Sequence, residues 1–417
     1  MKVLVVGSGG REHAICMKIK ESSKVSKLYC APGNGGIAQI AQCVDIKAED
    51  LDKIVEFSVY SGIDLVVVGP EAPLVAGLVD KLNEKGIKAF GPTKRGALFE
   101  GSKSFSKDFM EKYSIPTAKY KVYTNSQKAI EELNSFQTPI VVKADGLAAG
   151  KGVLICETIE EAEEAIKNIM DEKQFGNAGN RIVIEEFLRG TEASLLCFVD
   201  GKNIIPMESA RDYKKAFDGD KGLNTGGMGC FSPNPIFTEE LKKYIKEHIL
   251  DKTLKGFISE KIDFKGVLFI GLMVENNEAK VLEYNTRFGD PETEVVLPRL
   301  KSDLVDIMLK CIEGNLREED LKWKEEKCVT VVLASGGYPE NYEKGKEITG
   351  LDKVDEDIIV FHGGTRLSEG KVLTDGGRVL AVTALGRTLE EARYKVYNNI
   401  NKIKFDKIQY RKDIARI

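Results

Sequence analysis

The chain has 417 residues, which is too long for one ordinary hydrophobic core, so we expect roughly two to four domains. Apolar residues make up 42% and charged residues 30%, and the formal net charge is -4. This balance describes a globular protein without the basic excess of a nucleic-acid-binding protein. No apolar run approaches the ~20 residues of a membrane span, and MKVLVV leads straight into a strand. We therefore predict a cytoplasmic protein that binds neither nucleic acid nor a membrane.

Cysteine and histidine usage narrows the kinds of site. Eight cysteines are scattered without a CxxC pair, and only three histidines occur. We expect buried free thiols rather than disulfides or a zinc site. The scarcity of histidine argues against a histidine-based metal site or catalytic triad.

The first unit, residues 1–102, alternates short apolar runs with amphipathic stretches. The apolar runs are KVLVVG, KLYCAPG, DLVVVGPE and KAFGP. Strands that alternate with helices predict an N-terminal doubly wound parallel sheet. Ligands bind beyond the carboxyl ends of the strands in such sheets. Those ends are glycine-rich here, at 7–10, 33–36 and 69–71, so we expect a site along that edge.

The second unit, residues 103–324, is predicted to combine α/β and α+β structure. A helix at SKSFSKDFMEKY precedes the strands PIVVKAD and GVLICE, which flank a glycine-rich loop. From Thr191 to about Lys310 the pattern indicates the strands ASLLCFVD, GVLFIGLMVE and AKVLEYN and a helix near 238–259. The charged stretch at 317–327, REEDLKWKEEK, is predicted to be helical. The strands CVTVVLAS, IIVFHGG and RVLAVTALG then predict a β-rich C-terminal domain over 325–417.

The segment GSGGREH follows a strand and opens a helix, which favours a bound phosphate. Free backbone N–H groups and the helix dipole attract anions there. A dinucleotide fingerprint starting at Gly7 would need a small residue at position 12, where this chain has Glu12. The alternative is a structural turn, with Arg11 as an ordinary surface arginine.

Two further segments suggest a nucleotide site. Lys143 lies in the apolar strand of VVKADGLAAGKGV, which is costly unless its charge meets an anion, and the following small residues can close over phosphates. The spacing from Gly146 to Lys151 does not fit a Walker A loop. The alternative is a hairpin whose lysine reaches solvent. The stretch IEEFLRGTE offers main-chain groups for an adenine and a carboxylate for a ribose, although charged strand ends are common.

The segment VLEYNTRFGDPE carries the strongest indication of chemistry. Glu283 and Asn285 are two residues apart on a predicted strand and so project from one face. Carboxylate and amide oxygens suit magnesium. Arg287 is next on that face if the strand continues, and its guanidinium would meet phosphate or carboxylate oxygens. An ordinary solvated sheet edge is the alternative.

In this order the segments resemble the ATP-grasp superfamily. GSGGREHA, KADGLAAGKGV and RFGDPETE look most like its phosphoribosylamine–glycine ligase family, over essentially the whole chain. The resemblance implies a central ATP-grasp fold with a mobile lid at about 117–190. It also implies a ligase that uses ATP and magnesium, or manganese in its place. The ligase would join glycine to 5-phosphoribosylamine through glycyl phosphate, giving glycinamide ribonucleotide, ADP and phosphate in purine synthesis.

The resemblance also implies residue roles. ATP phosphates would meet Lys103, Lys143 and the loop that contains Gly150, Lys151 and Gly152. Adenine and ribose would be held by Glu185, Glu186, Leu188 and Glu192, and magnesium by Glu283 and Asn285. The phosphoribosylamine site would use Gly9, Gly10, Arg11, Gly33, Asn34 and Glu71, with Asn224 in the same cleft. The catalytic residues would be Lys143, Arg287 beside the transferred phosphoryl group, and Asp212 at the glycine amino group.

One departure from the superfamily leaves the metal count open. Many ATP-grasp enzymes place a second metal-binding carboxylate where this chain has Phe269–Leu272, which contains no acid. Another ATP-grasp ligase or a carboxylase is the alternative function, and a nicotinamide-dependent or non-catalytic nucleotide-binding protein is a more distant one. The absence of an obvious coiled coil predicts a monomer. A transient contact with the preceding enzyme of purine synthesis is left open.

Overall fold

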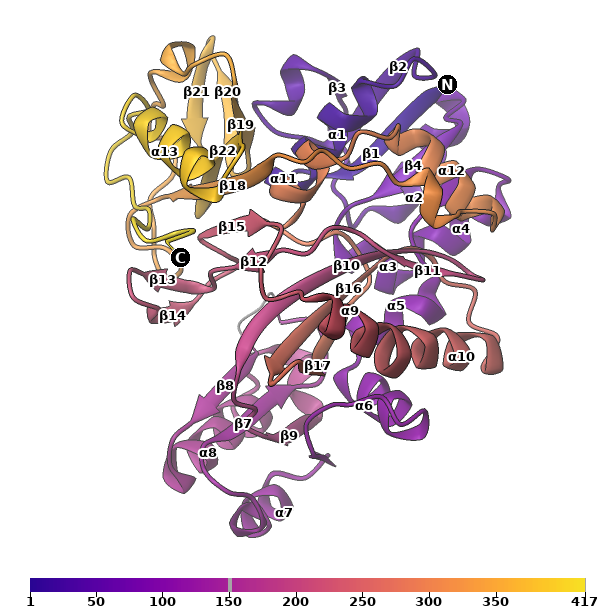
Figure 1. Cartoon of the computed structure of the whole chain (residues 1–417), viewed down its shortest axis with the longest axis vertical. Helices are drawn as coiled ribbons and strands as arrows, with labels where there is room; N and C mark the ends of the chain where they lie inside the picture. Colours follow the sequence, from indigo (N-terminus) through magenta and orange to yellow (C-terminus); the bar gives the residue numbers. More distant parts are fainter. Residues whose placement is uncertain (149–151, 417) are drawn as a thin grey trace.

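The N-terminal domain is a five-stranded sheet in which every strand pairs in parallel, in the order β3-β2-β1-β4-β5. Figure 1 shows the computed structural model, in which residues 1–148 and 152–416 are described. The elements of this domain are β1 (Lys2–Gly7), α1 (Gly10–Lys20), β2 (Lys27–Pro32), β3 (Gln42–Cys43), α2 (Leu51–Ser61), β4 (Leu65–Val68), α3 (Glu71–Ala76), α4 (Leu78–Glu84), β5 (Lys88–Phe90) and α5 (Lys94–Gly101). The predicted doubly wound parallel sheet is confirmed.

Helices cover both faces of this sheet because its central strands are apolar on both sides. Val3 to Val6 of β1 and Leu65 to Val67 of β4 are fully buried. One face packs on residues of α2 and α4, and the other packs on α1 and on α12 (Leu304–Glu313). Two-sided burial explains why these strands read as continuous apolar runs.

The next part of the chain forms a small antiparallel sheet with its own core. α6 (Lys103–Lys112) leads into strands of order β6-β9-β7-β8. Its elements are β6 (Tyr120–Tyr123), α7 (Ser126–Glu131), β7 (Ile140–Ala144), β8 (Val153–Cys156), α8 (Ile159–Ile166) and β9 (Ile182–Glu186). Side chains from its strands and helices pack together on one face of the sheet, including Ile140, Ile166 and Ile184.

A second antiparallel sheet follows, in the order β11-β10-β16-β17. Its elements are β10 (Thr191–Asp200), β11 (Ile204–Pro206), α9 (Glu239–Ile245), α10 (Asp251–Ser259), β16 (Lys265–Glu275) and β17 (Glu278–Asn285). A π-helical turn at Lys246–Leu250 joins α9 to α10, so the helical region predicted near 238–259 is present. Phe99, Phe109 and Phe257 pack between this sheet and its helices.

The C-terminal sheet recruits two strands from the central region. Its order is β12-β15-β18-β22-β19, and all its pairings are antiparallel. Its elements are β12 (Arg211–Asp212), β15 (Gly229–Ser232), β18 (Lys327–Ala334), β19 (Ile358–His362), β22 (Arg378–Gly386) and α13 (Leu389–Ile400). Two hairpins lie beside it, β13 (Lys215–Phe217) with β14 (Lys221–Asn224) and β20 (Thr365–Ser368) with β21 (Lys371–Thr374). The segment that carries Asp212 is therefore anchored to the C-terminal domain.

The helix predicted over 317–327 is wrong. Only Glu318–Asp320 forms a single 3-10 turn. The residues after this turn are extended and pair with the segment around Lys301. The backbone N–H of Lys301 donates to the carbonyl of Lys322 at 2.7 Å. Leu321 is buried and Trp323 packs on the core, with a lysine between them. This alternation has the period of a strand rather than of a helix. The helices before this segment are α11 (Thr293–Val296) and α12.

All eight cysteines are free; seven are buried and Cys43 is half-buried. Within 1–148 and 152–416, no helix combines the length and the apolar character needed to cross a membrane.

Two of the three histidines meet where the N-terminal and C-terminal domains pack together. The backbone N–H of His362 in β19 donates to Nδ1 of His13 in α1 at 2.8 Å, and the rings lie 5.6 Å apart. Nδ1 of His362 lies 3.0 Å from the hydroxyl of Thr365. Burial lowers the pKa of His13 to about 3 and that of His362 to about 4. Both rings are therefore neutral in the folded protein at neutral pH.

This pair predicts an acid-sensitive domain interface. An unfolded histidine takes a proton near its ordinary pKa of about 6.5, whereas these folded rings resist until far lower pH. The contribution of the two neutral rings to stability is complete above the unfolded pKa of about 6.5. It is lost as the pH falls from there toward the folded pKa values. At pH 5 the loss is about 2 kcal/mol for each ring. We expect the thermal midpoint to fall between pH 7.5 and pH 5.0, and to fall less in His13→Gln/His362→Gln. Equal falls in both proteins would contradict the assignment.

Candidate active site

A cavity of about 40 Å³ lies where α6, β7, β9 and β17 meet. Residues from four distant stretches of the sequence line it, and five of them were predicted to bind ATP or magnesium. These five are Lys103, Lys143, Glu185, Glu283 and Asn285. Together they place positive charges and oxygen ligands around one space, which suits a polyphosphate with a divalent cation.

Lys103 ties the first turn of α6 to the start of the glycine-rich loop. Its Nζ donates to the carbonyl of Ala144 at 2.9 Å and to that of Gly146 at 3.0 Å. Asp145 accepts from the backbone N–H of Ser104 at 3.1 Å, which fixes the same junction. Burial lowers the pKa of Lys103. The ammonium group of Lys103 is thus poorly hydrated, and an anion bound beside it would be strongly attracted.

Lys143 meets a carboxylate rather than solvent. Its side chain is only 8% exposed, and its Nζ lies 2.9 Å from Oε1 of Glu185 on the neighbouring strand β9. The other oxygen of Glu185 lies 3.0 Å from Nζ of Lys107. The anion that a lysine in an apolar strand requires is therefore supplied by the protein itself.

Glu283 and Asn285 project from the same face of β17, as their spacing predicts. Nδ2 of Asn285 donates to Oε1 of Glu283 at 3.5 Å. Burial alone would raise the pKa of Glu283, but Lys214 and Lys143, with a further lysine, outweigh it and lower the pKa. The carboxylate is charged, and an amide oxygen donor lies beside it, so the pair fits a magnesium ion. Gly271 lies opposite Glu283 in the sheet and supplies no second acid.

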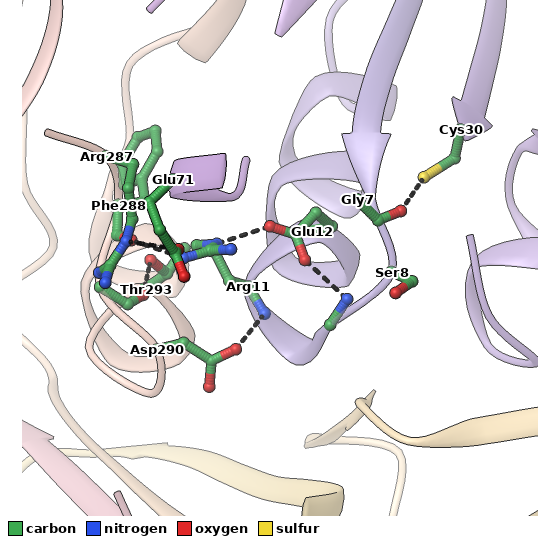
Figure 2. Close-up of polar contacts among 12 residues, drawn as sticks. Gly7, Ser8, Arg11, Glu12, Cys30, Glu71, Arg287, Phe288, Asp290 and Thr293 are labelled. Atoms are coloured by element: carbon green, nitrogen blue, oxygen red, sulfur yellow. Dashed lines mark hydrogen bonds and ion pairs between the residues drawn. The ribbon is translucent and has the colours of Figure 1, made fainter. Parts of the chain in front are cut away.

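Arg287 lies in the turn after β17, because the strand ends at Asn285. Its guanidinium bridges two carboxylates, with Nη2 2.9 Å from Oε1 of Glu100 and Nε 3.4 Å from Oε2 of Glu71. Figure 2 shows Arg287, Glu71 and Arg11 in one group. Burial would raise the pKa of Glu71, but Arg287 and Arg11 lower it. The residue predicted beside the phosphoryl group is thus held next to the edge predicted for phosphoribosylamine.

The start of α1 is already capped by carboxylates (Figure 2). Glu12 accepts from the backbone N–H of Gly9 at 2.6 Å, and Asp290 accepts from that of Arg11 at 3.4 Å. A Cβ added at Gly69 would lie 2.1 Å from Oε1 of Glu12, so glycine is required there. Glu12, the departure from the dinucleotide fingerprint, therefore fills the turn. A phosphate at Gly9 or Gly10 would have to share these donors with, or displace, the two carboxylates.

Asn34 uses its side chain to hold its own turn. Its Nδ2 donates to the carbonyl of Ser8 at 2.8 Å and to that of His362 at 2.7 Å, and its Oδ1 accepts from two backbone N–H groups. Gly33 has a φ of +77°, and a Cβ there would lie 2.4 Å from Sγ of Cys43. Both residues have a structural role, and their predicted contact with substrate stays a prediction.

Asp212 lies in a group of charged residues that sequence analysis did not assemble. Its Oδ1 accepts no hydrogen bond from any of the described residues, and burial together with Glu292 raises its pKa well above the usual range. Glu292 is 4% exposed and accepts from the hydroxyl of Ser194 at 3.0 Å. Nζ of Lys214 lies 3.1 Å from Oε2 of Glu192. Buried acids beside a lysine suit a zwitterionic substrate.

The C-terminal domain also reaches this group. Nη1 of Arg378 lies 2.9 Å from Oδ1 of Asp290 and donates to the carbonyl of Gly226 at 2.7 Å. Arg378, Lys214, Glu292, Glu100 and Lys107 are the residues that sequence analysis missed. Only Glu292 carried an available indication, because it lies within the RFGDPETE segment.

The remaining predicted residues are placed as follows. Glu186 accepts from the backbone N–H of Lys119 at 3.0 Å, and Leu188 is buried just beyond β9. Asn224 ends β14 and pairs with Lys215. The carbonyl of Gly152 accepts from the backbone N–H of Ala144 at 2.9 Å. Gly150 and Lys151 lie outside the described residues.

Two antiparallel sheets and helix α6 bring Lys103, Lys143 and a carboxylate–amide pair to one cavity, and this arrangement defines an ATP-grasp protein. The chain belongs to the phosphoribosylglycinamide synthetase family. The models of that family match in order along the chain: the N domain over residues 1–100, the ATP-grasp (A) domain over 101–293 and the C domain over 328–417.

Named relatives agree over the full length. The phosphoribosylamine–glycine ligase of Clostridium acetobutylicum is 51% identical over 416 residues, covering 100% of both chains. The crystal structure of phosphoribosylamine–glycine ligase from Thermotoga maritima is similar with a TM-score of 0.88 and 36% identity, covering 99% of this chain and 100% of that one. The biotin carboxylase domain of 2-oxoglutarate carboxylase from Hydrogenobacter thermophilus, in complex with MgADP, ADP and bicarbonate, has a TM-score of 0.76 at 17% identity, covering 98% and 91%. This last likeness extends to the fold alone.

Proposed function

We propose that the chain is an ATP-dependent ligase that joins glycine to 5-phosphoribosylamine, giving glycinamide ribonucleotide, ADP and phosphate in purine synthesis. Membership of the family supports the choice of substrates. The single structural observation that carries the proposal is the cavity where Lys103, Lys143, Glu283 and Asn285 converge. That cavity would join the residues proposed to bind phosphates to the pair proposed to bind a metal ion.

The chemistry needs no protein nucleophile. A carboxylate is a poor electrophile, so one of its oxygens must first become part of a leaving group. In the proposed sequence, a glycine carboxylate oxygen attacks the γ-phosphorus of ATP, and ADP leaves. The phosphoribosylamine nitrogen then attacks the carbonyl carbon of glycyl phosphate, loses a proton, and phosphate departs. Lys103, Lys143 and Arg287 align the groups and stabilise the charge that develops in transfer.

Glu283 and Asn285 are proposed to hold magnesium, or manganese in its place. The ion would neutralise charge on the ATP phosphates when bound. Glu185, Glu186, Leu188 and Glu192 are proposed to hold adenine and ribose. The loop with Gly150 to Gly152 is proposed to cover the phosphates.

The acceptor side of the proposal uses the N-terminal edge and Asp212. Phosphoribosylamine is assigned to Gly9, Gly10, Arg11, Gly33, Asn34 and Glu71, with Asn224 in the same cleft. Asp212 is assigned to the glycine amino group. Oδ1 of Asp212 has no hydrogen-bond donor among the described residues, and Glu292 lies nearby, so an ammonium group there would supply a donor and a charge to these acids.

Omission assays test the substrates. Phosphate release from ATP is measured with magnesium, glycine and freshly generated phosphoribosylamine, leaving out each component in turn, and the product is identified by mass. We expect release only in the complete mixture, together with glycinamide ribonucleotide. Release supported by a different acid or amine would favour the alternative, another ATP-grasp ligase or a carboxylase. No phosphate release under any mixture would remove the ligase proposal.

We also propose that residues 117–190 act as a lid over the nucleotide. The unit has its own apolar core. Polar contacts join it to α6 and β17, among them Lys103 with Ala144, Lys107 with Glu185, and Lys143 with Leu282. Magnesium and a non-hydrolysable ATP analogue should slow proteolysis of the loop between Lys143 and Gly152 severalfold, as ordering on closure requires. Cleavage at an unchanged rate, despite saturating analogue, would argue against closure.

The domain limits 1–102, 103–324 and 325–417, the monomeric state and the cytoplasmic location stay predictions. A transient contact with the preceding enzyme of purine synthesis is a prediction as well. Sedimentation of the purified chain tests the predicted monomeric state, and a dimer would contradict it.

A further inference from the structure

A third lysine, Lys107, lines the same cavity as the two lysines that are proposed to contact ATP phosphates. Lys107 lies one helical turn after Lys103 on α6 and is only 2% exposed. Its Nζ lies 3.0 Å from Oε2 of Glu185 and donates to the hydroxyl of Thr117 at 2.7 Å. None of the roles proposed for ATP, magnesium or substrates uses this residue. A buried lysine is costly, so its charge requires a structural or functional reason.

The carboxylate of Glu185 is shared between two lysines. Oε1 lies 2.9 Å from Lys143, and Oε2 lies 3.0 Å from Lys107. All three side chains are at most 8% exposed, so solvent screens the charges little. The group carries one net positive charge when both lysines are protonated. Glu185 therefore cannot neutralise both lysines.

The three side chains also come from both sides of the nucleotide site. Lys107 belongs to α6, whereas Glu185 and Lys143 belong to β9 and β7 of the small sheet. Thr117, which accepts from Lys107, donates in turn to the carbonyl of Val281 at 2.6 Å in β17. Lys107 is thus linked through Thr117 to β17, and its ion pair with Glu185 connects α6 to the small sheet.

We propose that Lys107 is a positioning residue that weakens the hold of Glu185 on Lys143, leaving the Lys143 ammonium available to ATP phosphates. The inference rests on the proposed contact between Lys143 and ATP. Without Lys107, Glu185 forms a neutral pair with Lys143, and the site loses one positive charge. Both changes act in the same direction, against binding of a polyanion. Burial lowers the pKa of Lys107 to about 8, so Lys107 is protonated in most molecules at neutral pH.

Calorimetric titration with a non-hydrolysable ATP analogue and magnesium at pH 7 tests this directly, apart from any ligase assay. We expect Lys107→Met to weaken analogue binding roughly tenfold. Lys107→Arg, which keeps the charge, should restore most of the affinity. Lys112→Met is the matched control on the same helix, because Lys112 is exposed and forms an ion pair with Glu260. It should bind like the unaltered protein.

A double-mutant cycle separates positioning from a structural effect. In Glu185→Gln there is no carboxylate to share, so only the lost charge of Lys107 acts, and adding Lys107→Met should weaken analogue binding about threefold rather than tenfold. Thermal midpoints of all variants establish that each is folded. Unchanged binding in folded Lys107→Met, or an equal loss with and without Glu185, would overturn the inference. If the unaltered protein fails to bind the analogue at all, the proposed ATP site fails instead.

Discussion

Replacing Glu283 with glutamine should lower kcat/KM at least about 1000-fold, a loss of ~4 kcal/mol of transition-state stabilisation. Glu283 is the charged member of the carboxylate–amide pair on β17, and three lysines hold its pKa low. Glutamine keeps the shape but removes the charge that a magnesium ion requires. The remaining lysines would then lack their compensating carboxylate, so both metal binding and phosphate alignment would suffer.

The measurement is steady-state product formation at saturating magnesium, with the thermal midpoint as a control for folding. Glu278→Gln is a matched variant, because Glu278 is exposed at the other end of the same strand. It should leave turnover within about twofold, as surface substitutions usually do. A folded Glu283→Gln protein with near-normal turnover would remove Glu283 from the metal site.

Replacing Arg287 with alanine should also lower kcat at least about 1000-fold, with little change in the KM for ATP. The guanidinium is held between Glu71 and Glu100 at the junction of the nucleotide cavity and the N-terminal edge. Arg287 is proposed to act on the transferred phosphoryl group and the substrate beside it, rather than on the remainder of ATP. ATP affinity should persist because Lys103 and Lys143 are unaltered.

Lysine at the same position distinguishes charge from geometry. Arg287→Lys keeps the charge but cannot reach two separate carboxylates in a planar arrangement, so we expect recovery of only a small part of the lost rate. It also guards against misfolding, because Glu71 and Glu100 would otherwise lose a shared cation. Arg317→Ala, at an exposed arginine, is the control. Full activity in folded Arg287→Ala would contradict its role.

Most of the fold follows from hydrophobic periodicity. The alternation of short apolar runs with amphipathic stretches predicted the parallel sheet, and the two-residue spacing in VLEYN placed Glu283 and Asn285 on one face. The region at 317–327 was mistaken for a helix because its charge content hides the alternation of Leu321 and Trp323. β12 has only two residues and β15 four, so no periodicity could show that they join the C-terminal sheet.

The site was predictable where one segment supplies neighbouring ligands. It was not predictable where residues distant in sequence meet. Lys107 and Glu185 are 78 positions apart by their numbers, and their pairing depends on how the small sheet docks on α6. Arg378 reaches Asp290 only because two domains pack together. Arg287 left the predicted strand face because β17 ends two residues earlier.

Transfer of oxygen from glycine to phosphate tests the central claim most directly. Glycine labelled with ¹⁸O in its carboxylate is incubated with ATP, magnesium and phosphoribosylamine, and the phosphate is analysed by mass. Formation of glycyl phosphate requires each phosphate released with product to carry one oxygen from glycine. We expect one ¹⁸O in phosphate for every glycinamide ribonucleotide formed. Unlabelled phosphate accompanying the product would contradict the acyl phosphate mechanism.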